Sequence, residues 1–545
     1  MRLFAHVSDA SLDQLQATVA MALLGLSLVC LPRAYQRVWQ VWQPATARTT
    51  RVATVALALA AIVRWLVAPK WIVTIYIGYH LTQQAIDLFP VSHYGVGSSA
   101  LYHALFGFLP HDHRTLLWVN SVIGVLTIPF LATFARRYHN DPRAGVAAAA
   151  LVALTPLFIK NDNSDANHVP CLWWLYGALV LWDEYIETRE RAPLFQAGAL
   201  FTLACIARPE MPVLLPIVLA LLTVGYWPKR DLWRDPWLYA TVALMAVALL
   251  PQVEHVTRQV DALQMRSSLP AFGANRTHVI AERFVRMNTL LTPGLFPTLV
   301  LAFAGLALVL PRPLALRRWA LGLAAIPSIA IYSLDLCRAN MARVHVPGAL
   351  LVTLLASAGV AYVWERVRLA PLRLALVVVL GFSLSRTVAP LWAPTNEQAE
   401  EDFLREALPR LPAGRLTLVR IGHGDREIIP GKSLFTHDHF PDYLVTPPVG
   451  EGQVMTVRQW TEHPDFSAPV FFYGGMRCYA QMRQPADAAP HGENYQRACA
   501  EMRERFVLEP VIERSVPNRR DVWLEYYGDA PRFTLGLYRV RPRAQ

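Results

Sequence analysis

The stretch DLFPVSHYGVGSSALY, residues 87–102, lies between two apolar segments, 51–68 and 116–134. It places the carboxylate of Asp87, the imidazole of His93 and the phenol of Tyr94 beside a predicted membrane span, and a glycine-rich turn follows them. Ionisable groups held at a membrane surface usually handle a polar or lipid-linked substrate. The alternative is that these side chains simply occupy the headgroup layer, where aromatic and His residues are stable. The remainder of the chain favours a functional role.

The composition indicates a membrane protein. Hydrophobic residues make up 54% of the 545 residues, charged residues only 17%, and the mean hydropathy is +0.29. A soluble chain of this length would carry more charge. The net charge of +11 arises from short basic clusters between apolar segments. Because that distribution is typical of cytoplasmic loops, we expect no nucleic-acid partner.

Apolar segments long enough to cross, or nearly cross, a bilayer recur about twelve times before residue 390. Arg and Lys clusters at 33–51, 136–143, 229–234, 312–318 and 366–373 fall on one side of them, which the positive-inside rule makes cytoplasmic. The loops 69–114, 159–168, 252–292 and 335–345 then face outward, although the loop 252–292 also carries several Arg residues. We therefore predict an all-α polytopic membrane bundle of about 11–12 transmembrane helices over residues 1–394.

Residues 395–545 differ in composition from the rest of the chain. Charge is dense there, and short β-type runs such as 416–421, 469–475 and 534–540 alternate with an apparent helix at 494–506. We predict a soluble α/β domain on the outer, periplasmic face of a bacterial inner membrane. Cys478 and Cys499 are the two cysteines of this region, and in an oxidising compartment they could form a disulfide. The alternative is that the two thiols lie too far apart to pair.

Polar residues concentrate in the predicted outer loops. Asp162, Asp165 and His168 lie in KNDNSDANHVP (160–170) and could ligate a divalent metal, although a short polar turn between spans contains the same residue types. Arg208 and Glu210 could contact a substrate or simply pair with each other. Further candidates precede a late span and could bind a phosphate or act as interfacial anchors; they are Arg338, Arg343 and His345.

Four segments, in this order, resemble the C-type integral-membrane glycosyltransferases, especially the branch related to protein O-mannosyltransferases. They are HYGVGSSALYHALFGFL (93–109), AALVALTPLFIKNDNSDANHVPCLWWLYGALVLW (149–182), AGALFTLACIARPEMPVLLP (197–216) and RANMARVHVPGALLVTLLASAGVAYV (338–363). The family usually carries its catalytic Asp early in the first outer loop, but the corresponding stretch 75–84 contains no carboxylate. Asp87 is the only acid before His93, and Tyr94 and Gly95 replace two prolines of the family segment.

The resemblance implies an enzyme that moves a sugar from a polyprenyl-phosphate carrier to an acceptor glycan, lipid or protein at the outer face. On this reading we expect Asp87 as the base, Arg338 and Arg343 at the carrier phosphate, and Asp162 and Asp165 around the sugar or a metal. Because the usual position of the family acid is empty, the alternative is a divergent or inactive member of the family. His93 and Tyr94 would shape the pocket, and no nucleotide cofactor is needed. Two other classes remain open: a transporter or lipid-binding membrane protein without chemistry, and a polymerase or ligase of surface polysaccharide.

Overall fold

The chain folds into two compact units, which we describe separately. The computed structural model describes residues 7–43, 47–67, 77–88, 95–208, 211–225, 230–262, 296–310, 314–333, 345–385, 396–421, 453–479, 493–518 and 531–543. The first unit comprises residues 1–70, 84–259 and 272–393 and is helical; the second comprises 71–83, 260–271 and 394–545 and contains a small sheet. The predicted class, a mostly helical membrane protein with a C-terminal α/β region, is confirmed.

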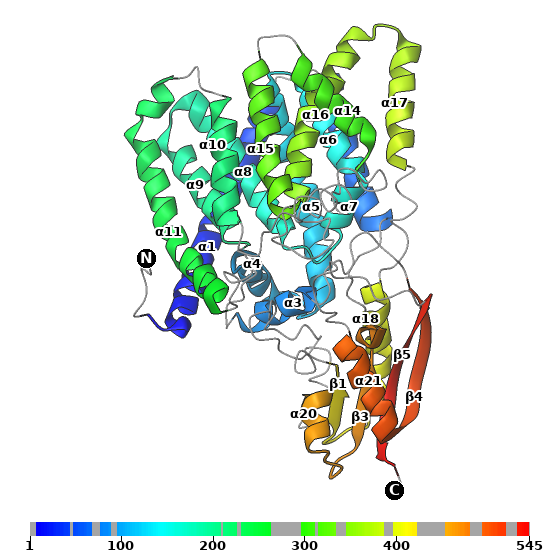
Figure 1. Ribbon diagram of the computed structural model, residues 1–545. Coiled ribbons are helices and arrows are strands. Elements are labelled where there is room, and N and C mark those ends of the chain that lie inside the picture. Colours follow the sequence, from blue (N-terminus) through cyan, green and yellow to red (C-terminus); the bar gives the residue numbers. More distant parts are fainter. Residues whose placement is uncertain are drawn as a thin grey trace, which may run out of the picture. The chain divides into compact units, whose positions relative to one another are not determined.

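The helical unit is built around α5, which spans His113–His139 and packs against α6 and α8 (Figure 1). Its helices in chain order are α1 (Asp9–Trp42), α2 (Ala47–Ile62) with the π-turn Val63–Val67, the last turn of α3 (Ile77–Asp87), α4 (Gly97–Phe106), α5, α6 (Pro142–Leu154), α7 (Pro156–Asp162), α8 (His168–Thr188), α9 (Arg191–Cys205), α10 (Met211–Val224), α11 (Pro236–Ala262), α14 (Thr298–Val309), α15 (Ala315–Ser333), α16 (Val346–Arg366) and α17 (Ala370–Ser385).

Four helices of the described ranges are long and apolar enough to cross a membrane: Ala10–Trp42, His113–His139, Pro236–His255 and Val346–Arg366. Several other segments that the sequence predicts as spans form shorter apolar helices, such as α10 and α14. The predicted single span 144–159 is instead two helices, α6 and α7, bent by 66°. The bend falls at Thr155–Pro156, because Pro156 has no N–H to continue the helix and restricts the residue before it.

The second unit contains a five-stranded sheet of order β2-β1-β3-β5-β4. The strands are β1 (Thr417–Arg420), β2 (Gln453–Thr456), β3 (Val470–Gly474), β4 (Phe506–Pro517) and β5 (Arg532–Pro542); β1 runs parallel to β2 and β3, and β5 runs antiparallel to β3 and β4. Helices α18 (Asn396–Ala407), α20 (Val457–Glu462) and α21 (Glu493–Arg505) pack on these strands. The apolar core includes Trp460, Phe472 and Met502. Cys478 and Cys499 form a disulfide, with Cα atoms 5.6 Å apart.

Candidate functional site

Polar side chains that would be expected at a surface are buried inside the helical unit. We call the following set the polar cluster: Arg64, Ser98, Tyr102, His113, Asn120, Ser121, Asp162, Asn163, Ser164, Asp165, Asn167, His168 and Arg208. Six of its thirteen members come from residues 162–168, at the junction of α7 and α8, which the sequence predicts as an outer loop. Buried polar groups are stable only when hydrogen bonds replace water. The partners of this segment therefore decide how it is held.

Two adjacent polar residues of α5 hold the segment. The Asn120 amide donates to the backbone oxygens of Ser164 and Ala166 at 2.8 and 3.2 Å. The Ser121 hydroxyl donates to the side-chain oxygen of Asn163 at 2.6 Å. Polar residues inside an otherwise apolar helix normally have such a partner, because an unsatisfied polar group in an apolar environment costs several kcal/mol. Asn120 and Ser121 are not among the residues predicted from the sequence, although their position in an apolar span is a visible signal.

Arg64 forms a buried ion pair with Asp162 of the same cluster. Its Nε atom lies 2.8 Å from Asp162 Oδ2, and the two side chains are 0% and 11% exposed. Its terminal nitrogens donate to the carbonyl oxygens of Ala153 and Val152 at 2.8 and 3.0 Å. The Val152 carbonyl lacks a helical donor because the residue four positions later is a proline. The Arg64 guanidinium thus satisfies both the carboxylate and the helix end at the α6–α7 bend.

Gly124 of α5 makes room for the Asp162 carboxyl group. A Cβ atom added at Gly124 would lie 2.4 Å from Asp162 Cγ, closer than two carbon atoms can approach. The Asp162 side chain therefore lies directly against the α5 backbone. Neighbouring Asp165 is fully buried, and its Oδ2 atom is 3.4 Å from Nε2 of His113. Both acids that the sequence proposes for sugar contact are thus enclosed by protein groups.

The turn after α9, residues 206–208, packs against the glycine-rich turn that precedes α4. Gly95 has φ +91°, and a Cβ atom there would lie 2.7 Å from the backbone carbon of Ala207. The Gly97 N–H donates to the carbonyl of Ile206 at 3.1 Å. Because any side chain at position 95 would be strained and would also clash, the two turns can approach this closely only with glycine. Gly95 and Gly97 therefore allow two chain segments to pack closely against each other.

The polar cluster links these turns to the α7–α8 segment through Asn167. The Arg208 Nη1 atom donates to Asn167 Oδ1 at 2.6 Å, and the Ser98 hydroxyl donates to the Asn167 carbonyl at 3.0 Å. Tyr102, one turn after Ser98, donates to Asn120 Oδ1 at 2.6 Å. Burial raises the pKa of the Tyr102 hydroxyl well above its ordinary value, so Tyr102 stays protonated as a donor. Helix α4 is thereby fixed to three segments of the chain.

Asp87 is the last residue of α3 and is exposed. The end of α3 is tied to α4 by two hydrogen bonds: the Ser99 hydroxyl donates to Gln84 Oε1 at 3.0 Å, and His103 Nδ1 lies 2.7 Å from the Ala85 carbonyl oxygen. Leu88, with φ 60°, closes the helix by donating to the Gln84 carbonyl. Asp87 is thus an exposed residue on a backbone that α4 ties to the polar cluster.

Of the remaining predicted site residues, some are buried in the helical unit and others lie outside the described residues. His345 precedes α16 and is buried, and burial lowers the pKa of its imidazole to about 4. His168 is buried at the start of α8. Five candidates lie outside the described residues, namely His93, Tyr94, Glu210, Arg338 and Arg343. Within the ranges given above, no three His, Cys, Asp or Glu side chains gather in a way that could hold a metal. Asp162, Asp165 and His168 thus do not form the metal site considered from the sequence.

Comparison with known proteins gives one sequence match and several weak structural ones. Residues 99–255 match the profile of the dolichyl-phosphate-mannose-protein mannosyltransferase family. No curated protein sequence matches the chain. That segment begins in α4 and ends in α11, so it contains most of the polar cluster.

Solved structures similar to the chain have low sequence identity. The Archaeoglobus fulgidus oligosaccharyltransferase in complex with zinc and sulfate is 14% identical, with a TM-score of 0.47; the match covers 74% of this chain and 62% of that one. ArnT from Cupriavidus metallidurans bound to undecaprenyl phosphate is 14% identical, with a TM-score of 0.49 and coverage of 90% and 98%. The chain thus spans about three fifths of the length of that oligosaccharyltransferase. The profile match over residues 99–255 confirms the resemblance predicted from the sequence, which is to the mannosyltransferase-like branch of the C-type glycosyltransferases.

Proposed function

We propose that the protein transfers a sugar from a polyprenyl-phosphate carrier to an acceptor at the outer face of the membrane. The observation that carries the proposal is the family match over residues 99–255, which coincides with the segments joined by the polar cluster. A polyprenyl-phosphate sugar is already activated, because the carrier phosphate is the leaving group. This reaction requires no nucleotide cofactor. We further propose that the membrane is a bacterial inner membrane and that residues 395–545 lie on its periplasmic side.

The transfer needs a base for the acceptor and positive charge for the leaving group. The acceptor oxygen attacks the anomeric carbon, the bond from that carbon to the phosphate oxygen breaks, and the acceptor proton passes to a carboxylate. We assign Asp87 as that base. Among Asp87, Asp162 and Asp165, it is the exposed one, and a base must reach an acceptor that arrives from outside. Arg338 and Arg343 are proposed to stabilise the charge that develops on the departing phosphate.

The buried acids take a different role in this proposal. Asp162 is paired with Arg64, and Asp165 lies beside His113, so we assign both as positioning residues that hold the α7–α8 segment. That segment holds α4 directly through Asn167 and indirectly through Asn120 of α5, which bonds both the segment and Tyr102, and α4 holds the end of α3. The polar cluster thus supports the backbone on which Asp87 stands. An error of about 1 Å in such a position can reduce turnover about 10²-fold.

The direct test is incubation of the purified full chain with labelled polyprenyl-phosphate hexoses and pentoses. The proposal predicts that label leaves the lipid for a second molecule, and that free carrier phosphate appears in equal amount. A matched control is Glu365→Gln, which removes an exposed carboxylate from α16 and should leave turnover unchanged. Retention of every donor with its label intact would instead favour a transporter or lipid-binding protein. A parallel incubation supplies preassembled glycans on the same carrier, and transfer of these alone would favour a polysaccharide polymerase or ligase.

A further inference from the structure

Helices α5 and α8, which carry part of the polar cluster, also form a group of ion pairs with α1 at the opposite end of α5. Asp183 and Glu187 lie one turn apart on α8, and they bind Arg137 of α5 at 2.8 and 2.7 Å. Arg37 of α1 also pairs with Glu187 and lies 4.0 Å from Asp183. Three helix ends are joined in this way. In the sequence these Arg residues indicate only the orientation of the chain, and Asp183 and Glu187 are not among the predicted site residues.

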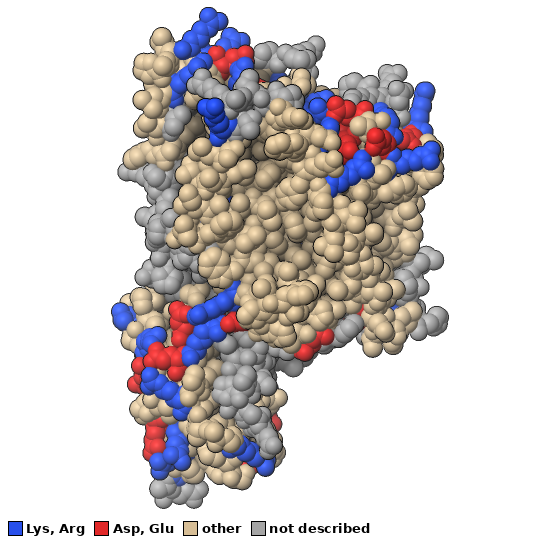
Figure 2. All heavy atoms as spheres, turned by 180° about the vertical axis from the view of Figure 1, so that it is seen from behind, with Lys and Arg blue, Asp and Glu red and all other residues tan. Residues whose placement is uncertain are grey.

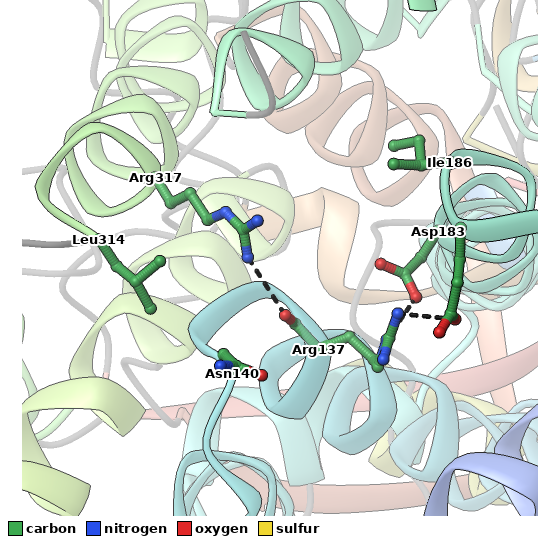
Figure 3. Close-up of a pocket in the computed structure, with 7 residues that line it drawn as sticks. Arg137, Asn140, Asp183, Ile186, Leu314 and Arg317 are labelled. Carbon is green, nitrogen blue, oxygen red and sulfur yellow. Dashed lines mark hydrogen bonds and ion pairs between the residues drawn. The ribbon is translucent and has the colours of Figure 1, made fainter. Parts of the chain in front are cut away.

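A cavity of about 250 Å³ opens beside these ion pairs (Figure 3). Arg137 and Asn140 come from the end of α5, Asp183 comes from α8, and Leu314 and Arg317 come from the start of α15. We call it the basic-end cavity. A second cavity of about 290 Å³ shares Arg137, Asn140 and Glu187 with it and is also lined by Arg37 and Arg136. Sites for drug-sized ligands span about 300–1,000 Å³, so the basic-end cavity suits a smaller group.

The charges around the basic-end cavity are balanced. Its lining contains two guanidinium groups, on Arg137 and Arg317, and two carboxylates, on Asp183 and Glu187. Backbone carbonyl oxygens at the end of α5 also contact the lining: Arg317 Nη1 donates to the Arg137 and Tyr138 carbonyls at 3.4 and 3.1 Å. A ligand with a single charge of either sign would meet repulsion from half of the lining. A ligand with both charges would meet complementary groups.

The location of the basic-end cavity narrows the ligand class further. It lies at the end of the membrane-spanning helix α5, next to the start of α15. Figure 2 shows a broad band of uncharged side chains on the helical unit, with charged side chains gathered along its upper edge. That edge corresponds to the headgroup layer of a bilayer, where charged and aromatic residues are found. Zwitterions that carry a phosphate and an ammonium group are abundant in such a layer.

We propose that the basic-end cavity binds a phosphoethanolamine group. Arg317 and Arg137 would hold the phosphate, since the planar guanidinium donates two parallel hydrogen bonds to phosphate oxygens. Asp183 and Glu187 would accept hydrogen bonds from the ammonium, because one carboxylate can accept about four hydrogen bonds and can serve an Arg and an ammonium together. Leu314 and Ile186 would contact the two-carbon linker. This proposal is independent of the proposed sugar transfer, which is placed at the other end of α5.

The test is native mass spectrometry of the purified full chain exchanged into mixed phosphatidylethanolamine, phosphatidylcholine and phosphatidylglycerol. The proposal predicts retention of phosphatidylethanolamine over the other two by about tenfold, the effect of one hydrogen bond between charged groups. Phosphatidylcholine has no N–H to donate, and phosphatidylglycerol has no ammonium. A parallel arm adds soluble phosphoethanolamine to lipid-depleted protein. Binding in that arm would identify the headgroup alone as sufficient, and its absence alongside lipid selectivity would identify the lipid as the ligand.

Three variants separate the cavity from general charge effects. Leu314→Trp fills the cavity without changing charge and should abolish the selectivity. Glu187→Gln should reduce the preference for phosphatidylethanolamine over phosphatidylglycerol about tenfold. Glu365→Gln, which removes an acid that pairs with Arg143 outside the cavity, should change neither. Equal retention of the three lipids by the unmodified protein, or selectivity that survives Leu314→Trp in folded protein, would overturn the proposal.

Discussion

Arg208 donates a hydrogen bond of 2.6 Å to the side-chain oxygen of Asn167, and both residues are buried. The bond joins the turn after α9 to the segment between α7 and α8, which are 41 positions apart in the sequence. Ser98, at the start of α4, bonds the backbone oxygen of the same Asn167. Asn167 therefore connects three separate segments of the chain. The glycine-rich turn packs beside them, and a substitution in that turn can test the packing.

Gly95→Ala should destabilise the helical unit by about 2 kcal/mol, because the new Cβ atom would clash with Ala207 and the backbone would be strained. The measurement is the thermal unfolding midpoint in detergent. Gly305→Ala is the matched control, since nothing lies within 4 Å of a Cβ atom at that helical position. It should be neutral, or stabilising by up to about 1 kcal/mol. Equal midpoints for the two variants would show that the two turns do not pack as described.

The ion pair of Arg64 and Asp162 gives a second prediction. Asp162→Asn leaves a charged guanidinium buried without its carboxylate, and breaking such a pair costs about 3–5 kcal/mol. The additional change Arg64→Met should recover part of this loss, because it removes the uncompensated charge. Thermal unfolding of both variants measures the difference. An equal cost of Asp162→Asn with and without Arg64→Met would contradict the pairing. Glu365→Gln at an exposed pair should stay within about 0.5 kcal/mol of the unmodified protein.

Sequence patterns predicted the helical membrane class and the C-terminal α/β region because hydropathy and composition directly reflect the surrounding solvent. They did not predict that residues 161–168 would be buried, since a short polar segment between apolar runs has the composition of an exposed turn. Arg64 was a missed signal: an Arg inside an apolar run is costly and normally has a buried partner. The partner itself, Asp162, depends on the bend at Pro156 and on the absence of a side chain at Gly124. Local sequence periodicity does not predict such contacts between distant residues.

The disulfide between Cys478 and Cys499 should be recovered from protein prepared without reductant. Mass spectrometry should find the two peptides linked, because the two sulfur atoms are paired in the structure and the proposed periplasmic location of the domain is oxidising. Closing a loop of about 20 residues stabilises a domain by about 3 kcal/mol, so the double Ser variant should unfold at lower temperature. Alkylation of both thiols in intact cells would count against the pairing and against the outward orientation of the domain.

His345 predicts a pH dependence of stability. Burial lowers the pKa of the folded imidazole from 6.5 to about 4. Below pH 6.5 the unfolded chain binds a proton at this residue that the folded chain does not bind, so its contribution to stability is complete above pH 6.5 and is lost as the pH falls towards 4. Unfolding midpoints between pH 7.5 and pH 5 should therefore fall less steeply for His345→Gln than for the unmodified protein. Identical slopes would show that this imidazole titrates normally.

The assignment of Asp87 as the base is the central claim, and the transfer rate of Asp87→Asn tests it most directly. Asparagine keeps the size of the side chain but cannot accept the proton, and loss of a general base lowers turnover about 10²–10⁴-fold. The exposed position of Asp87 means that the unfolding midpoint should not change. The account predicts this loss of turnover with labelled donor, at an unchanged midpoint and with donor still bound. Near-normal turnover in Asp87→Asn, together with an inactive but folded Asp162→Asn or Asp165→Asn, would contradict it and would place the base in the α7–α8 segment.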